Sequence, residues 1–282
     1  MSPGREENDA MSEHFTSFCQ DIRELLLSTT DQEEIFRRGQ PLLAAMAGKP
    51  AFLQDVFHRM VTDEDYLMGL RLSADPNEVT LHKDKDGLFS VRLYIWDPAI
   101  SYPIHGHGSW GIVTTVAGLV EETRYQRLDD HSIPGYAKLK ETGRRLMAPG
   151  ETGRVLPLDL GIHKMGSAVK EHSSVGLHVY GKAIRPGFLE KFELDKESVY
   201  RVTYPGMNSR VYVLKALGAI EEPWAAEVLE QAVKDKRPLI RYEAVRALGV
   251  HQKEKALQIA EAEYNRESVM KSDFKALHDF LK

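Results

Sequence analysis

The sequence predicts a mainly β protein, in which a closed double sheet of short strands follows N-terminal helices and precedes a C-terminal helical segment. Three observations predict this fold. Apolar residues have helical spacing at the start of the chain, alternate with period two from about Glu78, and return to helical spacing after Pro205. The β region is divided by glycine and proline into short runs. The last segment repeats itself. We therefore divide the chain into residues 1–45, 46–204 and 205–282.

The first segment is predicted to form helices over about residues 13–28, 31–47 and 50–61, with no regular structure over residues 1–12. Asp31, with Glu34 three residues later, is a capping signal for the second helix. The single cysteine, Cys19, lies among apolar residues at helical spacing, so we expect it to pack in a core. One cysteine also excludes an intrachain disulfide framework, as is typical of a reducing cytoplasm.

The β region begins with VTLHKDKDGLFSVRLYIW, which predicts a hairpin that turns at Asp86 and Gly87. Its second strand places alternate apolar residues on one face: Phe89, Val91, Leu93 and Ile95. Further strands are expected near residues 110–117, 119–126, 144–148, 153–160, 164–170 and 174–184. In the last of these, Gly176, His178 and Tyr180 share one face, and Val175, Leu177 and Val179 share the other.

The C-terminal segment contains the tripeptide ALG at Ala216 and again at Ala247, a period of 247 − 216 = 31 residues. It resembles HEAT repeats of the short bacterial kind, and a chance likeness of two amphipathic helix pairs is the alternative. We expect a buried stripe made of Leu214, Leu217 and Ile220 in one copy and Val245, Leu248 and Val250 in the other. Two repeats bury an apolar face poorly, so packing on the β domain, self-association or a protein partner is expected.

Two histidines, His105 and His107, lie one residue apart on a predicted strand. Side chains of a strand alternate between its faces, so both imidazoles can reach one metal ion at about 2.1 Å. His163, which follows another apolar extended stretch, is the candidate third ligand. Because the chain has 11 histidines, a chance HxH without metal is the alternative.

The motif PIHGHGSWG resembles the first motif of the cupins, and in particular that of the cysteine dioxygenase type of thiol dioxygenases. GIHKM resembles the GLHRV of that family and VGLHVYG its SLHLY, so the resemblance spans roughly residues 45 to 200. It implies a cupin barrel in which ferrous iron, Fe²⁺, is held by His105, His107 and His163. By the same resemblance, His178 and Tyr180 are catalytic, and Trp110 is placed as in the mercaptopropionate dioxygenase branch, at the substrate.

The chain departs from the family at four positions. Gly111 stands where other cupins have a glutamate ligand, and Ile112 where animal enzymes have a cysteine that crosslinks to the tyrosine. Gly176 replaces the serine that bonds the second histidine of VGLHVYG, so that histidine needs a water or a backbone group instead. Counting back from FSVRLYIW places Val79 where the family has its carboxylate-binding arginine.

Without that arginine, burying an unpaired substrate carboxylate in an apolar pocket would cost roughly several kcal/mol of free energy. Arg92 is the candidate replacement and is assigned to substrate binding, since it shares a face with Ser90 and Tyr94. An outward-facing Arg92 remains the alternative, and His82 and Arg124 are weaker candidates.

The resemblance implies an iron-dependent dioxygenase that adds both atoms of O₂ to the sulfur of a small thiol and forms a sulfinate. Two alternatives stay open. One is a non-catalytic cupin that binds a metal or ligand and recruits a partner through its helical tail. The other is a three-histidine dioxygenase acting on a carbon substrate, with nickel, copper or zinc as its metal.

Composition limits the partners. The chain has 37 lysines and arginines against 42 aspartates and glutamates, for a net charge of −5, so a general nucleic-acid surface is not expected. The sequence has no run of eighteen apolar residues and its N-terminus lacks a signal-type apolar stretch. These features predict a cytoplasmic protein without a membrane partner.

Overall fold

The structure is a computed structural model that describes residues 4–70, 73, 75, 77–185, 187–203, 205–266 and 269–282, without the side chains of residues 4–12, 50, 205, 206 and 209. Two compact units are present. The first combines Met1–Gln126 with Glu141–Ala183, and the second combines residues 127–140 with Ile184–Lys282. The three-part division made from the sequence stays a prediction, and each unit is considered by itself.

The first unit begins with four helices, α1 (Gly4–Ser28), α2 (Gln32–Ala47), α3 (Pro50–Thr62) and α4 (Glu64–Gly69). Asp31 caps α2 as predicted, because its Oδ1 accepts a hydrogen bond from the backbone N–H of Glu33 at 2.9 Å. The expectation of no regular structure before residue 13 is wrong for residues 4–12, which extend α1. Adding residues to a formed helix avoids the cost of nucleation, so a packed helix can extend beyond its apolar stretch.

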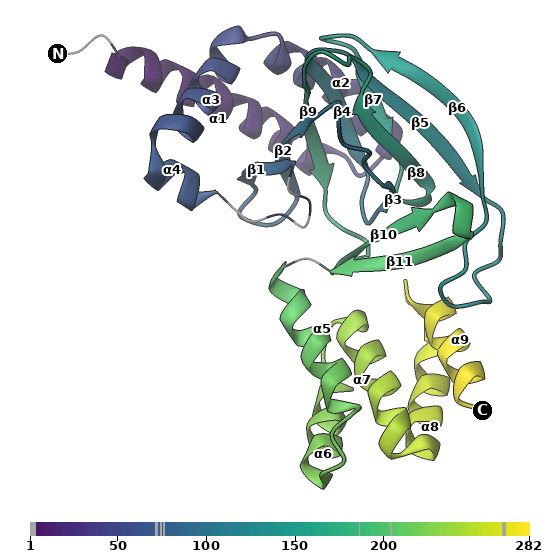
Figure 1. The fold of residues 1–282 in the computed structure, drawn as a ribbon. Helices are drawn as coiled ribbons and strands as arrows, with labels where there is room; N and C mark the ends of the chain where they lie inside the picture. Colours follow the sequence, from purple (N-terminus) through teal and green to yellow (C-terminus); the bar gives the residue numbers. More distant parts are fainter. Residues whose placement is uncertain are drawn as a thin grey trace. The chain divides into compact units, whose positions relative to one another are not determined.

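Two antiparallel sheets make up the rest of this unit (Figure 1). The first has the order β1 (Glu78–Lys83), β2 (Phe89–Trp96), β9 (Ser174–Gly181), β4 (Gly111–Ala117) and β7 (Thr152–Val155). In the second, β3 (Ile104–His107), β8 (Leu158–Ser167), β5 (Val120–Arg127) and β6 (Leu139–Met147) are neighbours in that order. This arrangement confirms the predicted double-stranded β-helix.

The helices cover the outer face of the first sheet, where α2 lies beside β4 and β7 (Figure 1). Phe36 and Leu43 of α2 are fully buried there against Leu93 of β2 and Leu177 of β9. Cys19 belongs to the same core, and burial, followed by the charge of Asp84, raises the pKa of its thiol to about 12. The cysteine is therefore a packing residue, as expected.

One strand prediction is wrong in a way that matters for the site. Residues 153–160 do not form one strand, because β7 ends at Val155 and β8 begins at Leu158, whose φ is +57°. Pro157 lies between them and has no N–H to continue a ladder. His163 consequently lies in the middle of β8 instead of following a strand.

The second unit contains the hairpin of β10 (Phe188–Glu193) and β11 (Ser198–Thr203), joined by the short helix η1 (Leu194–Lys196). Five helices follow: α5 (Pro205–Leu217), α6 (Pro223–Ala232), α7 (Pro238–His251), α8 (Lys253–Tyr264) and α9 (Lys271–Leu281). The two ALG copies meet, because a Cβ added at Gly218 would lie 3.3 Å from the Cβ of Ala247. The predicted repeat is thus formed by α5 with α6 and α7 with α8.

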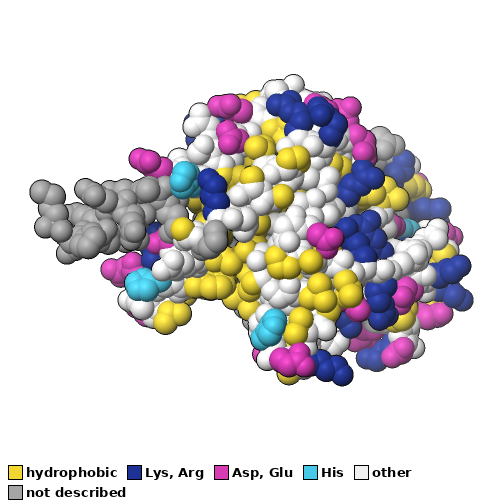
Figure 2. Space-filling view, turned by 90° about the horizontal axis from the view of Figure 1, so that it is seen from above, with side chains coloured by type: hydrophobic (Ala, Val, Ile, Leu, Met, Phe, Trp, Pro, Cys, Tyr) yellow, Lys and Arg dark blue, Asp and Glu magenta, His cyan; other side chains and the backbone are white. Residues whose placement is uncertain are grey.

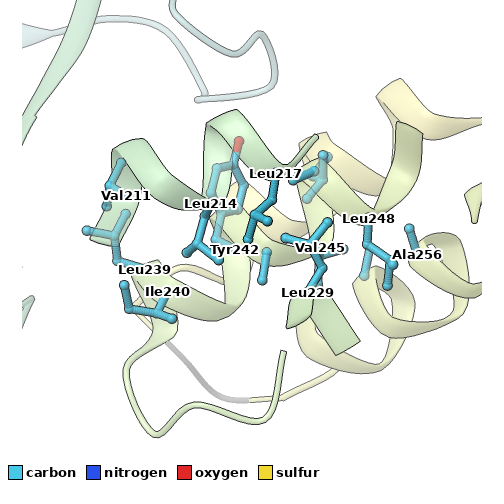
Figure 3. Packing of buried hydrophobic residues seen from close by; sticks show 14 of the residues in the cluster. Val211, Leu214, Leu217, Leu229, Leu239, Ile240, Tyr242, Val245, Leu248 and Ala256 are labelled. Atoms are coloured by element: carbon cyan, nitrogen blue, oxygen red, sulfur yellow. The ribbon is translucent and has the colours of Figure 1, made fainter. Parts of the chain in front are cut away.

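The repeat has one continuous core, in which Leu214, Leu217, Val245 and Leu248 are buried as predicted (Figure 3). Ile220 is partly buried at its margin. Val250 was assigned to the same stripe, but it is 72% exposed. Residues two positions apart in a helix point in directions about 200° apart around its axis, so Val250 faces away from the core that holds Leu248.

The face of the molecule drawn in Figure 2 carries side chains of every class. Acidic, basic and hydrophobic side chains are interspersed over the face in Figure 2. Among the described residues, no helix is both long enough and apolar enough to cross a lipid bilayer.

Leu248→Ala and Val250→Ala form a matched pair on α7. We expect Leu248→Ala to lower the free energy of unfolding of the helical repeat by about 2–5 kcal/mol through the cavity it leaves. Val250→Ala should change it by less than about 0.5 kcal/mol. Urea unfolding followed by circular dichroism measures both. Equal losses would show that this core is packed differently.

Candidate metal centre

Three histidines of the first unit converge. His105 and His107 lie on β3, and His105 is the cross-strand partner of His163 on β8. One ring nitrogen from each residue lies within 4.8 Å of the other two, and the Nε2 atoms of His107 and His163 are 2.9 Å apart. Such a group, in a cupin fold, could hold a metal ion, since imidazole is a common ligand of transition metals.

Hydrogen bonds at Nδ1 orient two of these rings. His105 Nδ1 lies 3.1 Å from the carbonyl oxygen of Pro103, and His163 Nδ1 lies 2.8 Å from Oε1 of Glu122. Both partners are acceptors, so Nδ1 carries the proton in each ring and donates it. Nε2 is then the deprotonated nitrogen that a metal requires.

Glu122 on β5 is a candidate site residue that the sequence analysis did not identify. Its side chain is 1% exposed and also accepts from Arg145 Nε at 2.6 Å, with Arg124 Nε at 3.3 Å. Burial opposes its ionisation, but the hydrogen bond and charge of His163 and the charges of the two arginines outweigh burial and lower the pKa of Glu122 to about 2. Glu122 is thus a carboxylate at any ordinary pH.

The pairing of β5 with β8 explains why Glu122 reaches the site. Arg124 is the partner of His163 and Glu122 the partner of Met165, so these side chains share one face. The sequence offered one signal, because Glu122 lies two positions after the apolar Val120 and so on the same face of the strand. The register between β5 and β8 was needed to place it beside His163.

The environment keeps His107 neutral. Burial, followed by the positive charges that His105 and His163 would carry, lowers the pKa of His107 well below its ordinary value. A neutral imidazole needs no deprotonation before it binds a metal.

His178 and Tyr180, predicted to be catalytic, lie beside this cluster on β9. The Tyr180 hydroxyl is 3.1 Å from His178 Nδ1, and its ring stacks on His107 with centroids 5.2 Å apart. His178 Nε2 is buried without a hydrogen-bond partner among the described residues. Burial, followed by the charges of His163 and Arg92, lowers the pKa of His178 well below its ordinary value.

Two glycines make room for aromatic rings. A Cβ at Gly111 would lie 2.6 Å from the Tyr180 ring, so no glutamate ligand fits there. A Cβ at Gly176 would lie 2.8 Å from the Trp96 indole and 2.9 Å from His178 Nε2. The Trp96 ring therefore occupies the space of the family's serine, and no backbone group replaces that serine at His178 among the described residues.

The crosslink position also differs from the sequence expectation. Gly111, and not Ile112, is the cross-strand partner of Tyr180. Ile112 is buried on the opposite face, under the helices. Neither residue is a cysteine, so a crosslink to the tyrosine remains impossible.

Arg92 belongs to a polar group on the inner wall. Its Nη1 donates to the Glu78 carboxylate at 3.1 and 3.2 Å, and its guanidinium lies 5.1 Å from the centroid of the Tyr180 ring. The Tyr94 hydroxyl donates to the same carboxylate at 2.5 Å. Glu78 thus balances the charge of Arg92, and the substrate-binding role of Arg92 stays a prediction.

Val79, predicted to stand at the position of the carboxylate-binding arginine, does not face the inner wall. A register shift between Thr80 and His82 displaces the count along β1, and Val79 packs with the core under the helices. Glu78, the partner of Tyr94, faces the inner wall instead. His82 lies against Phe89, with ring centroids 5.4 Å apart, on the outer side.

Trp110 packs in the core under the helices. Its indole meets Phe36 edge to face at 6.2 Å and lies over Gly181, where a Cβ would come within 2.2 Å of the ring. Substrate contact by Trp110 stays a prediction that this packing does not favour.

A family model for HEAT repeats matches residues 208–272. The match covers α6, α7 and α8 and most of α5, so the predicted helical repeat is similar to HEAT repeats.

Several solved structures resemble the chain weakly. A DMSP lyase DddQ from Ruegeria pomeroyi is 15% identical over 49% of this chain and 70% of its own, with a TM-score of 0.32. A cupin 2 conserved barrel domain protein from Salinispora arenicola is 18% identical over 42% and 84%, with a TM-score of 0.30. The DMSP lyase structures of RdDddP and RnDddQII match at 16% identity over 34% of this chain and 39% of that chain, with a TM-score of 0.24. Similarity at this level carries no information on activity.

Glu122→Gln tests the carboxylate behind His163. The amide keeps the shape of the side chain but removes its charge, so we expect metal affinity to fall by about 10–100-fold. Competition with a chromophoric chelator measures the loss. Glu121→Gln, the neighbouring exposed residue on β5, is the control and should leave the affinity unchanged. An unaltered affinity in Glu122→Gln would refute the role of this carboxylate.

Gly176→Ser tests the space taken by Trp96. Because a Cβ there would overlap the indole, we expect the free energy of unfolding to fall by about 1–3 kcal/mol. The double variant Gly176→Ser with Trp96→Leu should recover part of that loss. Thermal unfolding of the three proteins decides the point, and a single variant as stable as the parent would contradict this packing.

Proposed function

We propose that the protein is a non-haem iron enzyme that oxidises a small thiol to a sulfinate with O₂. The observation that carries the proposal is the convergence of His105, His107 and His163 beside the pair of His178 and Tyr180. The reaction RSH + O₂ → RSO₂H balances without a further reductant, because sulfur loses the four electrons that O₂ gains. The motifs shared with the cysteine dioxygenase type support the same reaction.

The donor set fits ferrous iron. Three imidazoles, two of which donate from Nδ1 and so keep Nε2 deprotonated, suit this ion and leave coordination positions for a thiolate and O₂. Bound iron would lower the pKa of the thiol and activate O₂. His105, His107 and His163 would hold it, with Glu122 and the Pro103 carbonyl fixing two of the rings.

The neighbouring side chains position the reactants and handle the proton. The Tyr180 hydroxyl, next to His178 Nδ1, holds a proton that it can donate to the reacting oxygen or sulfur. The partly buried ring of Tyr94 and the buried ring of Trp96 lie against His178, with centroids 4.5 and 5.6 Å away, and limit its contact with water. His178 Nε2 is left to accept or donate one hydrogen bond to a substrate group.

The inner wall suggests which thiols fit. Arg92 can orient a substrate carboxylate only if it shares its guanidinium with Glu78, which already balances its charge. Burial, followed by the negative charge that Tyr180 would carry if ionised and by that of Glu78, raises the pKa of Tyr94 well above its ordinary value, so Tyr94 remains a neutral hydrogen-bond donor. We therefore propose that thiols lacking a carboxylate are accepted at least as well as cysteine.

Iron content and oxygen uptake test this function. Anaerobically reconstituted protein should retain about one iron per chain. It should consume O₂ and form a sulfinate with at least one of cysteine, mercaptopropionate and cysteamine. His105→Ala should lose iron and activity together, whereas His172→Ala, an exposed histidine outside the cluster, should keep both. Iron-loaded protein that oxidises none of these thiols would contradict the proposed reaction.

A further inference from the structure

Glu122 also lines an open surface cavity of about 400 Å³ within the first unit. Residues of α2, β5, β6 and β7 form its walls: Gln40, Glu122, Arg124, Arg144, Arg145 and Arg154, with Thr152 and two glycines. A second cavity, of about 190 Å³, shares Glu122, Arg124 and Arg154 and extends to His163. Two arginines, Arg124 and Arg154, therefore line the cavity that reaches His163.

The charge of this cavity contrasts with that of the chain. Four guanidinium groups face one carboxylate in its lining, although the chain as a whole has a net charge of −5. The ion pairs of Arg144 and Arg154 with carboxylates outside the lining are weak, because the side chains of Glu33, Glu141 and Glu121 are 73%, 46% and 37% exposed. These two arginines can therefore turn to a bound anion at little cost.

Arg145 shows that the cavity wall is shaped around a guanidinium. A Cβ at residue 153 would lie 1.9 Å from Arg145 Nη2, so the guanidinium lies in the space that Gly153 leaves beside β7. Arg145 Nε donates to Glu122, whereas Nη2 is buried without a hydrogen-bond partner among the described residues. A donor left without a partner is costly, and an anionic oxygen would satisfy it after a small movement of the side chain.

We propose that this cavity binds a small oxyanion of the sulfate or phosphate type, and that the anion is linked to the metal centre through Glu122. Planar guanidinium groups bind tetrahedral oxyanions with paired hydrogen bonds. The anion competes with Glu122 for Arg124 and Arg145, so more of the Glu122 charge acts on His163. Both this change and the added negative charge favour a cation at the three histidines. The linkage, though not the anion site, rests on the proposed metal binding.

Titration of metal-free protein with potassium sulfate, by calorimetry at constant ionic strength, tests the anion site first. We expect saturable binding that falls by about tenfold or more in the double variant Arg144→Gln with Arg154→Gln. Both arginines are half-exposed, so the variant should fold as the parent does. Arg37→Gln removes an exposed arginine of α2 that does not line the cavity and should bind sulfate normally. No saturable binding, or equal binding by all three proteins, overturns the site.

Anaerobic competition for ferrous iron, with sulfate replacing chloride at equal ionic strength, tests the linkage. Iron affinity should rise about fivefold or more in the parent and not in the double variant. Bound sulfate that leaves iron affinity unchanged overturns the linkage. If no protein binds iron, the proposed function and the linkage both fail, while the sulfate titration still decides the anion site.

Discussion

The structure of the site depends on one buried hydrogen bond, from His163 Nδ1 to Glu122. Burying a carboxylate this deeply costs roughly several kcal/mol of hydration free energy, which hydrogen-bond donors must offset. His163 Nδ1 and Arg145 Nε donate hydrogen bonds to it at 2.8 and 2.6 Å. The first of these bonds fixes both the orientation of the His163 ring and its tautomer. The metal ligand His163 and the arginine-lined cavity therefore share one carboxylate, Glu122.

Strand alternation separates this polar unit from the core. On β9, Val175, Leu177 and Val179 pack under the helices, while the intervening residues face the cluster. Because each strand supplies one face to the core, helices α1 to α3 can stabilise the sheet without contacting the site. The inner wall is crowded instead, so that glycine is required at 111 and 176 to admit the rings of Tyr180 and Trp96.

Much of the fold could be predicted from the sequence, because periodicity and capping are local signals. The hairpin at Gly87, the cap at Asp31 and the repeated ALG are of this kind. The three histidines could be grouped because motif order implied their strands. Glu122 could not, since its role depends on the register between β5 and β8. The position of Val79 was obtained by counting residues along β1, where a register shift between Thr80 and His82 was not foreseen. Val250 was assigned to the buried face of α7, but it lies on the exposed face.

X-ray absorption at the iron edge of the reconstituted protein tests the central claim most directly. The account predicts about three imidazole nitrogens near 2.1 Å from the metal, and a spectrum with one imidazole fewer in His163→Ala. Iron bound without imidazole scattering, or a coordination shell that His163→Ala leaves unchanged, would contradict it.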